Sequence, residues 1–267
     1  MRIGFIGSGN MVGAIASGAV QSGTVSGEDV WLTDRSGKSA PALAKRIGAH
    51  VAKSNSELAK TCDLIVLGVK PAGITAVADE IAKSLTSEKT VISLAAGIKT
   101  STIEDHVGNV PVVRVMPNVN AQIGQSMTGI AAGKHAGDEQ VAKAEELMGA
   151  VGETMVVEES QFAAFAALAG CSPCWLYAIV DALARAGVKH GLTKDAATRI
   201  VAQAMLGSAA LVQAELQEGQ IPANLMDRVS SPGGTTVAGL LAAQEAGLAP
   251  ALVKAVDAAV KRDNELG

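Results

Sequence analysis

A glycine-rich turn near the start of the chain has the residues that bind a phosphate group. The stretch GFIGSGNMVGA places Gly7, Gly9 and Gly13 between an apolar run and a segment with helical character. Backbone amides at a helix N-terminus face an anion, and glycines let a pyrophosphate approach closely. This context favours a dinucleotide site over a merely tight strand–helix turn. The third position of the usual fingerprint holds Val12, and Gly13 comes one place late, which leaves the closeness of helix and strand open.

The residues after the next apolar run bear on which dinucleotide would bind. Asp34, Arg35 and Ser36 lie where the adenine ribose is expected. An acidic residue there hydrogen-bonds the ribose 2′-hydroxyl of NAD, whereas arginine and serine suit the 2′-phosphate of NADP. The two signals conflict, so the sequence is compatible with either cofactor. Further on, Lys70 and Pro71 follow the run LIVLGV, where Lys70 would touch the cofactor or be a solvated strand-end lysine.

A second polar turn lies in the C-terminal half, in VSSPGGTTVAG at 229–239. Its glycines and threonines expose successive backbone N–H groups just before a predicted helix, and the hydroxyls of Ser231, Thr235 and Thr236 add to this anion nest. A capped helix N-terminus is the alternative, but a cap needs only one such residue. Two anion sites, one in each half, predict a dinucleotide on one side and a small carboxylate on the other.

Cys171 and Cys174, in AGCSPCW, have the spacing of a redox dithiol or of half a zinc site. A redox pair is expected at the end of a strand, whereas this stretch lies in a region predicted to be helical. Zinc would need two further ligands, and the four histidines (50, 106, 135 and 190) are scattered. We predict no metal site and interpret both cysteines as small buried packing residues.

The elements that must position these motifs change along the chain. From residue 1 to about 157, β-rich runs alternate with helical segments, which predicts an α/β domain with a doubly wound, mainly parallel Rossmann-type sheet. The predicted strands are 2–7, 30–34, 64–69, 90–95, 112–116, 127–132 and 153–158. The predicted helices are 10–21, 38–47, 71–85 and 138–149.

After about residue 158 only helices are predicted, at 160–189, 194–218 and 236–262, so we expect domains at 1–157 and 158–267. The stretch IVAQAMLGSAALVQA at 200–214 has no charged residue and must be buried on every side. Such a small domain can build little core alone. We therefore expect it to pack against a second copy of itself; the alternative is a helix sunk between its own neighbours.

The composition excludes several classes of partner. A net charge of −4 argues against nucleic acid or an anionic membrane as a partner, since both demand a basic face. The longest apolar stretches are too short for a membrane span, and the N-terminus lacks the anatomy of a signal peptide. We expect a cytoplasmic protein with a small-molecule substrate.

Together the motifs resemble those of pyrroline-5-carboxylate reductase. They are IGFIGSGNM, IVLGVKP, MPN at 116–118 and, most specifically, VSSPGGTTVAGL, with support from GVKHGL and AQAMLGSA. The resemblance runs end to end. It implies a Rossmann domain followed by an all-helical dimerisation domain, and dimers that often build decamers. It also implies hydride transfer from NADPH or NADH to the imine carbon of 1-pyrroline-5-carboxylate, the last step of proline biosynthesis.

The resemblance also suggests roles for individual residues. Thr236 matches the threonine whose hydroxyl faces the ring nitrogen, and it is the catalytic candidate. No strong general acid is required, because a cyclic imine is readily protonated by water. The substrate carboxylate would be held by Ser231, Gly233, Gly234 and Thr235. The cofactor would be held by Gly7, Ser8, Gly9, Asn10, Met11, Asp34, Arg35, Asn55, Val69, Lys70, Pro71, Ala95, Ala96 and Gly97.

The sequence departs from the family pattern near the expected cleft. Val119 and Asn120 follow MPN where many members have Thr-Pro, and Ile221 stands where a histidine commonly precedes the proline. Cys171 and Cys174 replace the usual serine and alanine. A reductase for a related cyclic imine or small carboxylate, and a catalytically silent nucleotide-binding paralogue, are therefore alternatives. The intact SPGGTT turn argues against a silent copy.

Overall fold

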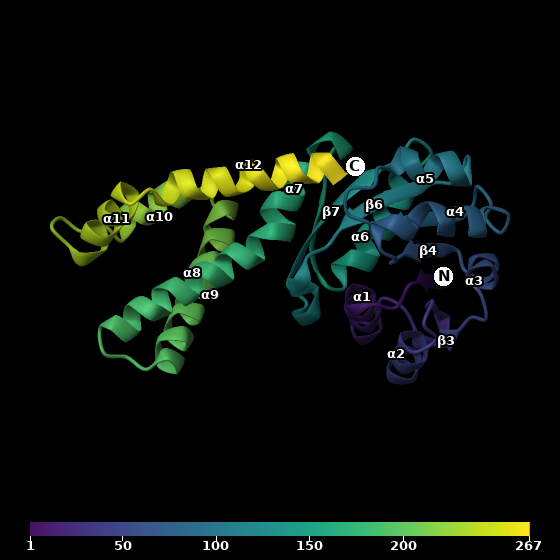
Figure 1. Ribbon diagram of the computed structural model, residues 1–267, viewed down its shortest axis with the longest axis horizontal. Coiled ribbons are helices and arrows are strands. Elements are labelled where there is room, and N and C mark those ends of the chain that lie inside the picture. Colours follow the sequence, from purple (N-terminus) through teal and green to yellow (C-terminus); the bar gives the residue numbers. More distant parts are fainter. Residues whose placement is uncertain (267) are drawn as a thin grey trace. The chain divides into compact units, whose positions relative to one another are not determined.

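The computed structural model describes residues 1–266, which form two compact units (Figure 1). The first comprises residues 1–171 together with the end of the chain from Ala259, and the second comprises Ser172–Ala258. All strands precede residue 157, after which we expected the domain boundary. The units instead divide between Cys171 and Ser172, because residues 159–169 contact Thr100, Arg114 and Asn118 of the first unit.

The first unit contains one eight-stranded sheet in the order β3-β2-β1-β4-β5-β6-β7-β8. All neighbouring strands are parallel except β6 and β7, which are antiparallel. The strand order reverses direction at β1, as a doubly wound fold requires, so the predicted α/β class is confirmed. The strands are β1 (Ile3–Ile6), β2 (Val30–Thr33), β3 (His50–Val51), β4 (Leu64–Leu67), β5 (Thr90–Ser93), β6 (Val112–Met116), β7 (Ser126–Ala132) and β8 (Gly152–Val156).

Alternating side chains of the central strands build a core on each face of this sheet. On β4, Leu64 and Val66 pack on one side, with residues of α1, α2 and α6, while Ile65 and Leu67 pack on the other, with residues of α3, α4 and α5. A strand buried on both faces needs a continuous apolar run, which explains LIVL. The helices are α1 (Asn10–Gln21), α2 (Ser39–Ile47), α3 (Asn55–Thr61), α4 (Ile74–Ala82), α5 (Thr100–Val107) and α6 (Asp138–Gly149).

Some elements of the first unit differ from the sequence prediction. The short strand β3 and the helices α3 and α5 were not predicted. The helix predicted at 71–85 begins as a 3-10 turn at Pro71–Gly73, because the proline fixes the start of the turn. The helix predicted at 160–189 is interrupted: α7 (Phe162–Phe165) leads into a π-helical turn at Ala166–Cys171, and α8 (Ser172–Lys189) follows.

The second unit is entirely helical. It contains α8, α9 (Lys194–Gln217), α10 (Pro222–Arg228), α11 (Thr235–Glu245) and the first part of α12 (Leu248–Leu266). The single helix predicted at 236–262 is wrong, because Gly247 adopts a left-handed conformation (φ 85°) that ends α11. The helix α10 was not predicted.

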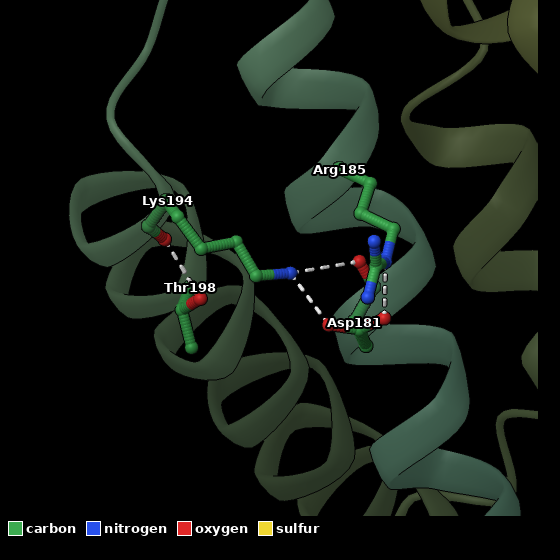
Figure 2. A network of polar contacts seen from close by, with 4 residues as sticks. All are labelled: Asp181, Arg185, Lys194 and Thr198. Carbon is green, nitrogen blue, oxygen red and sulfur yellow. Dashed lines mark hydrogen bonds and ion pairs between the residues drawn. The ribbon is translucent and has the colours of Figure 1, made fainter.

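A polar network joins α8 to the start of α9 (Figure 2). The carboxylate of Asp181 accepts hydrogen bonds from Lys194 Nζ at 2.5 Å and Arg185 Nε at 2.6 Å. The bonds from Lys194 and Arg185 lower the pKa of Asp181 to about 2. The bond from Lys194 to Asp181 holds the first turn of α9 to α8, and within that turn Thr198 donates to the carbonyl of Lys194.

Many apolar side chains of the helical unit are exposed in the single chain. On α9, Ile200, Leu206 and Leu211 are all exposed, although they belong to the charge-free stretch 200–214 that we expected to be buried. The alternative that this helix is buried between its own neighbours is therefore wrong.

By length and composition alone, Glu159–Lys189 could cross a membrane, and the bent pair Thr235–Glu245 and Leu248–Glu265 could form a second span. Exposed apolar helices are equally the mark of a subunit interface.

Candidate functional site

The turn between β1 and α1 has the geometry of a phosphate site. Gly7 has a φ of 95°, and an added Cβ would lie 2.8 Å from the carbonyl oxygen of Gly68, so only glycine fits there. Gly9 is the N-cap of α1 and has open space where its side chain would be. The hydroxyl of Ser8 donates to the Thr33 carbonyl at 3.0 Å, which ties the turn to β2. The turn therefore presents the first amides of α1 to a space that an anion fits.

Val12 on α1, in place of the third glycine of the fingerprint, packs against Gly68, the residue that follows β4. A Cβ on Gly68 would lie 2.2 Å from Cγ2 of Val12. The close approach that a third glycine usually provides is thus supplied by Gly68, at the end of β4. Gly68 was not among the predicted site residues, although its signal is visible in the sequence as the glycine that ends the apolar run LIVLG.

The carboxylate of Asp34 is directed into its own loop. It accepts hydrogen bonds from the backbone N–H of Gly37, from the backbone N–H of Ala40 at 2.5 Å and from the Ser36 hydroxyl at 3.1 Å. Burial raises the pKa of Asp34, but these hydrogen bonds, with one from Ser39, lower it below its usual value. Asp34 therefore caps the start of α2, while Arg35 and Lys38 are exposed in the same loop.

The other residues expected to hold the cofactor follow the carboxyl ends of neighbouring strands. Asn55, at the start of α3, accepts from the Thr33 hydroxyl at 2.7 Å and donates to Glu80 at 2.8 Å. Lys70 is exposed just after β4, between Val69 and Pro71. Ala95, Ala96 and Gly97 follow β5. Since β1, β2, β4 and β5 are parallel, their carboxyl ends share one edge of the sheet, where doubly wound folds bind their ligands.

A cavity of about 1140 Å³ lies beside the phosphate turn. Ser8, Gly9 and Asn10 line one end of it, and it continues along α1 and α2, with Arg46 donating to Ser17 at 2.9 Å. None of the expected cofactor residues from Asp34 onward lines this cavity. The cavity therefore overlaps the expected site only at the phosphate turn.

The second expected site is the turn at the start of α11, in the helical unit. Gly233 has a φ of 68°, and an added Cβ on Gly234 would lie 2.4 Å from Oγ of Ser231. The backbone N–H of Gly234 donates to the carbonyl of Ser231 at 3.0 Å. Gly234 is the N-cap of α11 and has no side chain to accept hydrogen bonds, so the amides that begin with Thr235 and Thr236 remain available to an anion.

The three cysteines differ in environment. Cys62 is buried, and burial raises the pKa of its thiol to about 12, which keeps it unreactive. Cys171 and Cys174 are exposed in the single chain, so the prediction that they are buried is wrong. They lie where the π-helical turn meets α8, and no other part of the single chain covers them. Within residues 1–266, no group of three or more His, Cys, Asp or Glu side chains could hold a metal ion.

The doubly wound sheet and its glycine turn define the class as an NAD(P)-dependent oxidoreductase of the Rossmann type. A family model described as "NADP oxidoreductase coenzyme F420-dependent" matches residues 2–97, and one described as "Pyrroline-5-carboxylate reductase dimerisation" matches residues 159–266. Residues 98–158, which include β6, β7 and β8, lie between the two matched segments in the sequence.

Similar proteins extend this assignment to the whole chain. The chain is 36% identical over 267 residues to a pyrroline-5-carboxylate reductase of Methanosarcina acetivorans, covering 100% of this chain and 98% of that protein. It is 35% identical to one of Glycine max, covering 99% and 95%. The chain belongs to the pyrroline-5-carboxylate reductase family, and the resemblance seen in its motifs is confirmed.

Solved structures agree in fold. The pyrroline-5-carboxylate reductase of Coxiella burnetii superposes with a TM-score of 0.93 at 34% identity, covering 100% of this chain and 98% of that one. The pyrroline carboxylate reductase of Plasmodium falciparum, solved with NADP bound, has a TM-score of 0.88 at 28% identity, covering 100% and 98%.

Proposed function

We propose that this protein reduces the C=N bond of 1-pyrroline-5-carboxylate to give L-proline. The reaction consumes one reduced nicotinamide and one proton, and it forms a C–H and an N–H bond. The observation that carries the proposal is the turn at 231–236, where a left-handed glycine and a second glycine packed on Ser231 open a helix. A chain that only bound a nucleotide would have no need of this second anion site.

The turn at 231–236 would hold the substrate by its carboxylate. Backbone N–H groups at the start of α11 and the hydroxyl of Ser231 would donate to the carboxylate oxygens. Any side chain at Gly234 would clash with Ser231 and displace the hydroxyl. The hydroxyl of Thr236 would then face the ring nitrogen and orient it, while the nitrogen takes its proton from water. When bound, the reduced nicotinamide supplies the hydride.

The direct test is steady-state kinetics of the purified protein with 1-pyrroline-5-carboxylate, following the oxidation of NADPH or NADH. We expect turnover to form proline. Thr236→Ala should lower kcat about tenfold or more, because one hydrogen bond to the reacting ring is lost, while Thr236→Ser should retain most of it. A protein that binds NADPH but turns over only other imines, such as the six-membered-ring homologue, would identify a related reductase. Binding without turnover of any imine would identify a silent paralogue.

We infer that the protein works as a homodimer in the cytoplasm, with decamers built from such dimers. The support is the match to a dimerisation model over 159–266 and the exposed apolar side chains of the helical unit. A second copy, rather than a membrane, would cover these faces. Light scattering coupled to size exclusion without detergent tests this: aggregation that only detergent relieves would favour a membrane.

We further propose that NADPH is preferred over NADH. Asp34 is the residue expected to bind the ribose 2′-hydroxyl of NAD, but its carboxylate already accepts from Gly37, Ala40 and Ser36. Those hydrogen bonds offset its charge, and the adjacent Arg35 and Lys38 are exposed cations suited to a 2′-phosphate.

Two substitutions separate these roles. Asp34→Asn keeps an oxygen that can cap α2, so the ratio of kcat/KM for NADPH to that for NADH should stay within about twofold. Arg35→Ala should lower the same ratio about tenfold or more, because a charged hydrogen bond to the phosphate is lost. If Asp34→Asn instead weakens NADH alone, then Asp34 binds the ribose and the preference must come from elsewhere.

A further inference from the structure

A buried charged residue in the middle of the sheet has no part in the proposed chemistry. Arg114 lies at the centre of β6, between Ser93 on β5 and Ala131 on β7, and only 5% of it is exposed. Its guanidinium carbon lies 4.4 Å from the ring centre of Phe162, and its Nη1 lies 3.5 Å from Oε1 of Glu159. A buried cation is costly, and an apolar side chain would stabilise such a position at least as well. The pair therefore requires a reason beyond stability.

Glu159 contacts a third segment of the chain, the start of α5. Its Oε1 accepts from the backbone N–H of Thr100 at 2.8 Å, and its Oε2 accepts from the Thr100 hydroxyl at 2.9 Å. The N-cap of α5 is Lys99, which makes no side-chain capping bond. The cap is thus supplied by a carboxylate 59 residues away along the chain. A local Ser or Asp at position 99 would cap the helix equally well but would join no distant segments.

The position of Thr100 fixes one end of a functional loop. Residues 94–99 connect β5 to α5 and include Ala95, Ala96 and Gly97, which are expected to hold the cofactor. At the other end, the buried Ser93 accepts from the backbone N–H of Ala95 at 3.3 Å. Both ends of the loop are therefore held, one by the sheet and one by Glu159.

Glu159 is also the first residue of the segment 159–171, which leads to the helical unit. After Glu159, Phe162 is buried against Arg114, and the ring of Phe165 occupies the space where a side chain on Gly129 would lie. In the π-helical turn, the carbonyl of Ala169 accepts from Nδ2 of the buried Asn118 at 2.9 Å. One ion pair thus holds both the loop and the first residues of this segment.

We propose that Arg114 and Glu159 are positioning residues that hold the loop 94–99 in the place required for hydride transfer. Glu159 fixes Thr100 through two hydrogen bonds, and Arg114 fixes Glu159 from within the sheet. This role rests on the proposed function in so far as the loop holds the cofactor. Neither residue touches the reacting atoms.

The test compares Glu159→Ala with Glu158→Ala, which removes the same charge from an exposed neighbour. Without cofactor, amide hydrogen exchange at Thr100 and across 95–99 should become about tenfold faster or more in Glu159→Ala alone. With NADPH bound, the nicotinamide emission lifetime should change, while the Kd stays within about threefold. In turnover, kcat should fall about tenfold to a hundredfold, and the isotope effect from NADPH deuterated at C4 should rise, as misplaced reactants predict.

Further variants guard against simple unfolding. Thr100→Val removes one of the two hydrogen bonds but leaves the Arg114–Glu159 ion pair, and it should give smaller changes in the same direction. Thr100→Ser keeps both bonds and should match the wild type. If exchange, emission lifetime and isotope effect in Glu159→Ala match those of Glu158→Ala while only the Tm falls, the pair is structural and the proposal is overturned. If the wild-type protein fails to reduce 1-pyrroline-5-carboxylate, the proposed function fails, and the exchange and emission measurements still decide the role of the pair.

Discussion

On β4 of the first unit, Ile65 is fully buried, whereas on α9 of the second unit Leu206 is 65% exposed. The contrast holds for most of the described chain, although Val51, Met155 and Val156 on the outer strands are exposed. The sheet is packed on both faces by core clusters from six helices, but Pro173, Ala184 and Ala197 are the only buried residues described within 172–258. Both units are rich in apolar residues, so composition does not explain the difference.

The difference shows that the two units complete their cores in different ways. The first buries its apolar side chains within one chain, as a domain of this size can. The second presents its apolar side chains outward, and it can bury them only against another surface. The dimerisation model matches this region, so folding of the helical unit should be coupled to association.

The largest effect should come from a charge on the exposed face of the helical unit. Leu206→Glu places a carboxylate where an apolar contact with the second copy is expected, and burying an unpaired charge is very costly. We expect the protein to elute as a monomer and kcat/KM to fall about a hundredfold or more, while NADPH binding by the first unit persists. Light scattering and fluorescence titration measure the two properties. As a control, Val51→Glu introduces the same charge on the exposed strand β3 of the first unit and should leave the assembly intact. A dimer formed by the Leu206→Glu variant would contradict the comparison.

A second effect distinguishes the two ways of completing a core. Ile65→Ala should lower the free energy of unfolding by about 3–4 kcal/mol, because it leaves a cavity in a packed core. Leu241→Ala, at a position on α11 that is 59% exposed in the single chain, should instead make the unfolding midpoint depend more strongly on protein concentration. Urea unfolding at several protein concentrations measures both. Equal, concentration-independent losses in the two variants would show that the helical unit folds on its own core.

A smaller effect tests the contact between Gly68 and Val12, which replaces the contact of the third fingerprint glycine. Gly68→Ala places a methyl group against Val12 and should cost about 1–3 kcal/mol of stability, with weaker NADPH binding, because α1 must shift. The double variant Gly68→Ala with Val12→Ala removes the clashing atom and should recover much of both losses. A double-mutant cycle from thermal unfolding and fluorescence titration gives the coupling; additive losses would show that the two residues do not constrain each other.

Much of the first unit could be predicted because its signals are local. Runs such as LIVL and VVRVM have the composition of buried strands, and α1 and α6 begin and end at the predicted residues. The helix α3 also had a local signal, since Ser54 caps it and accepts from the N–H of Glu57 at 3.1 Å, but the Ser-x-x-Glu pattern was overlooked. The cap of α5 could not be predicted locally, because it is supplied by Glu159 from a distant part of the chain.

The site divides in the same way. The glycine turn and the SPGGTT turn are contiguous stretches whose backbone geometry follows from glycine, so the sequence revealed them. The environment of Asp34 depends on amides that reach its carboxylate only after α2 has formed, and the contact of Val12 with Gly68 joins α1 to β4. Cofactor preference and helix–strand closeness were therefore left open by the sequence.

The smallest effect is expected at the junction between the two units, where Cys171 and Cys174 are exposed. Helical positions three apart place their Cβ atoms roughly 5–6 Å apart, whereas a disulfide requires about 3.5–4.5 Å. A dithiol switch would thus have to unwind the start of α8. Cys171→Ser combined with Cys174→Ala should change kcat/KM by less than about twofold, as surface substitutions usually do, and reductant should not alter wild-type turnover. Loss of activity in the variant, or activation of the wild type by reductant, would instead make this junction a redox element that couples the sheet unit to the helical unit.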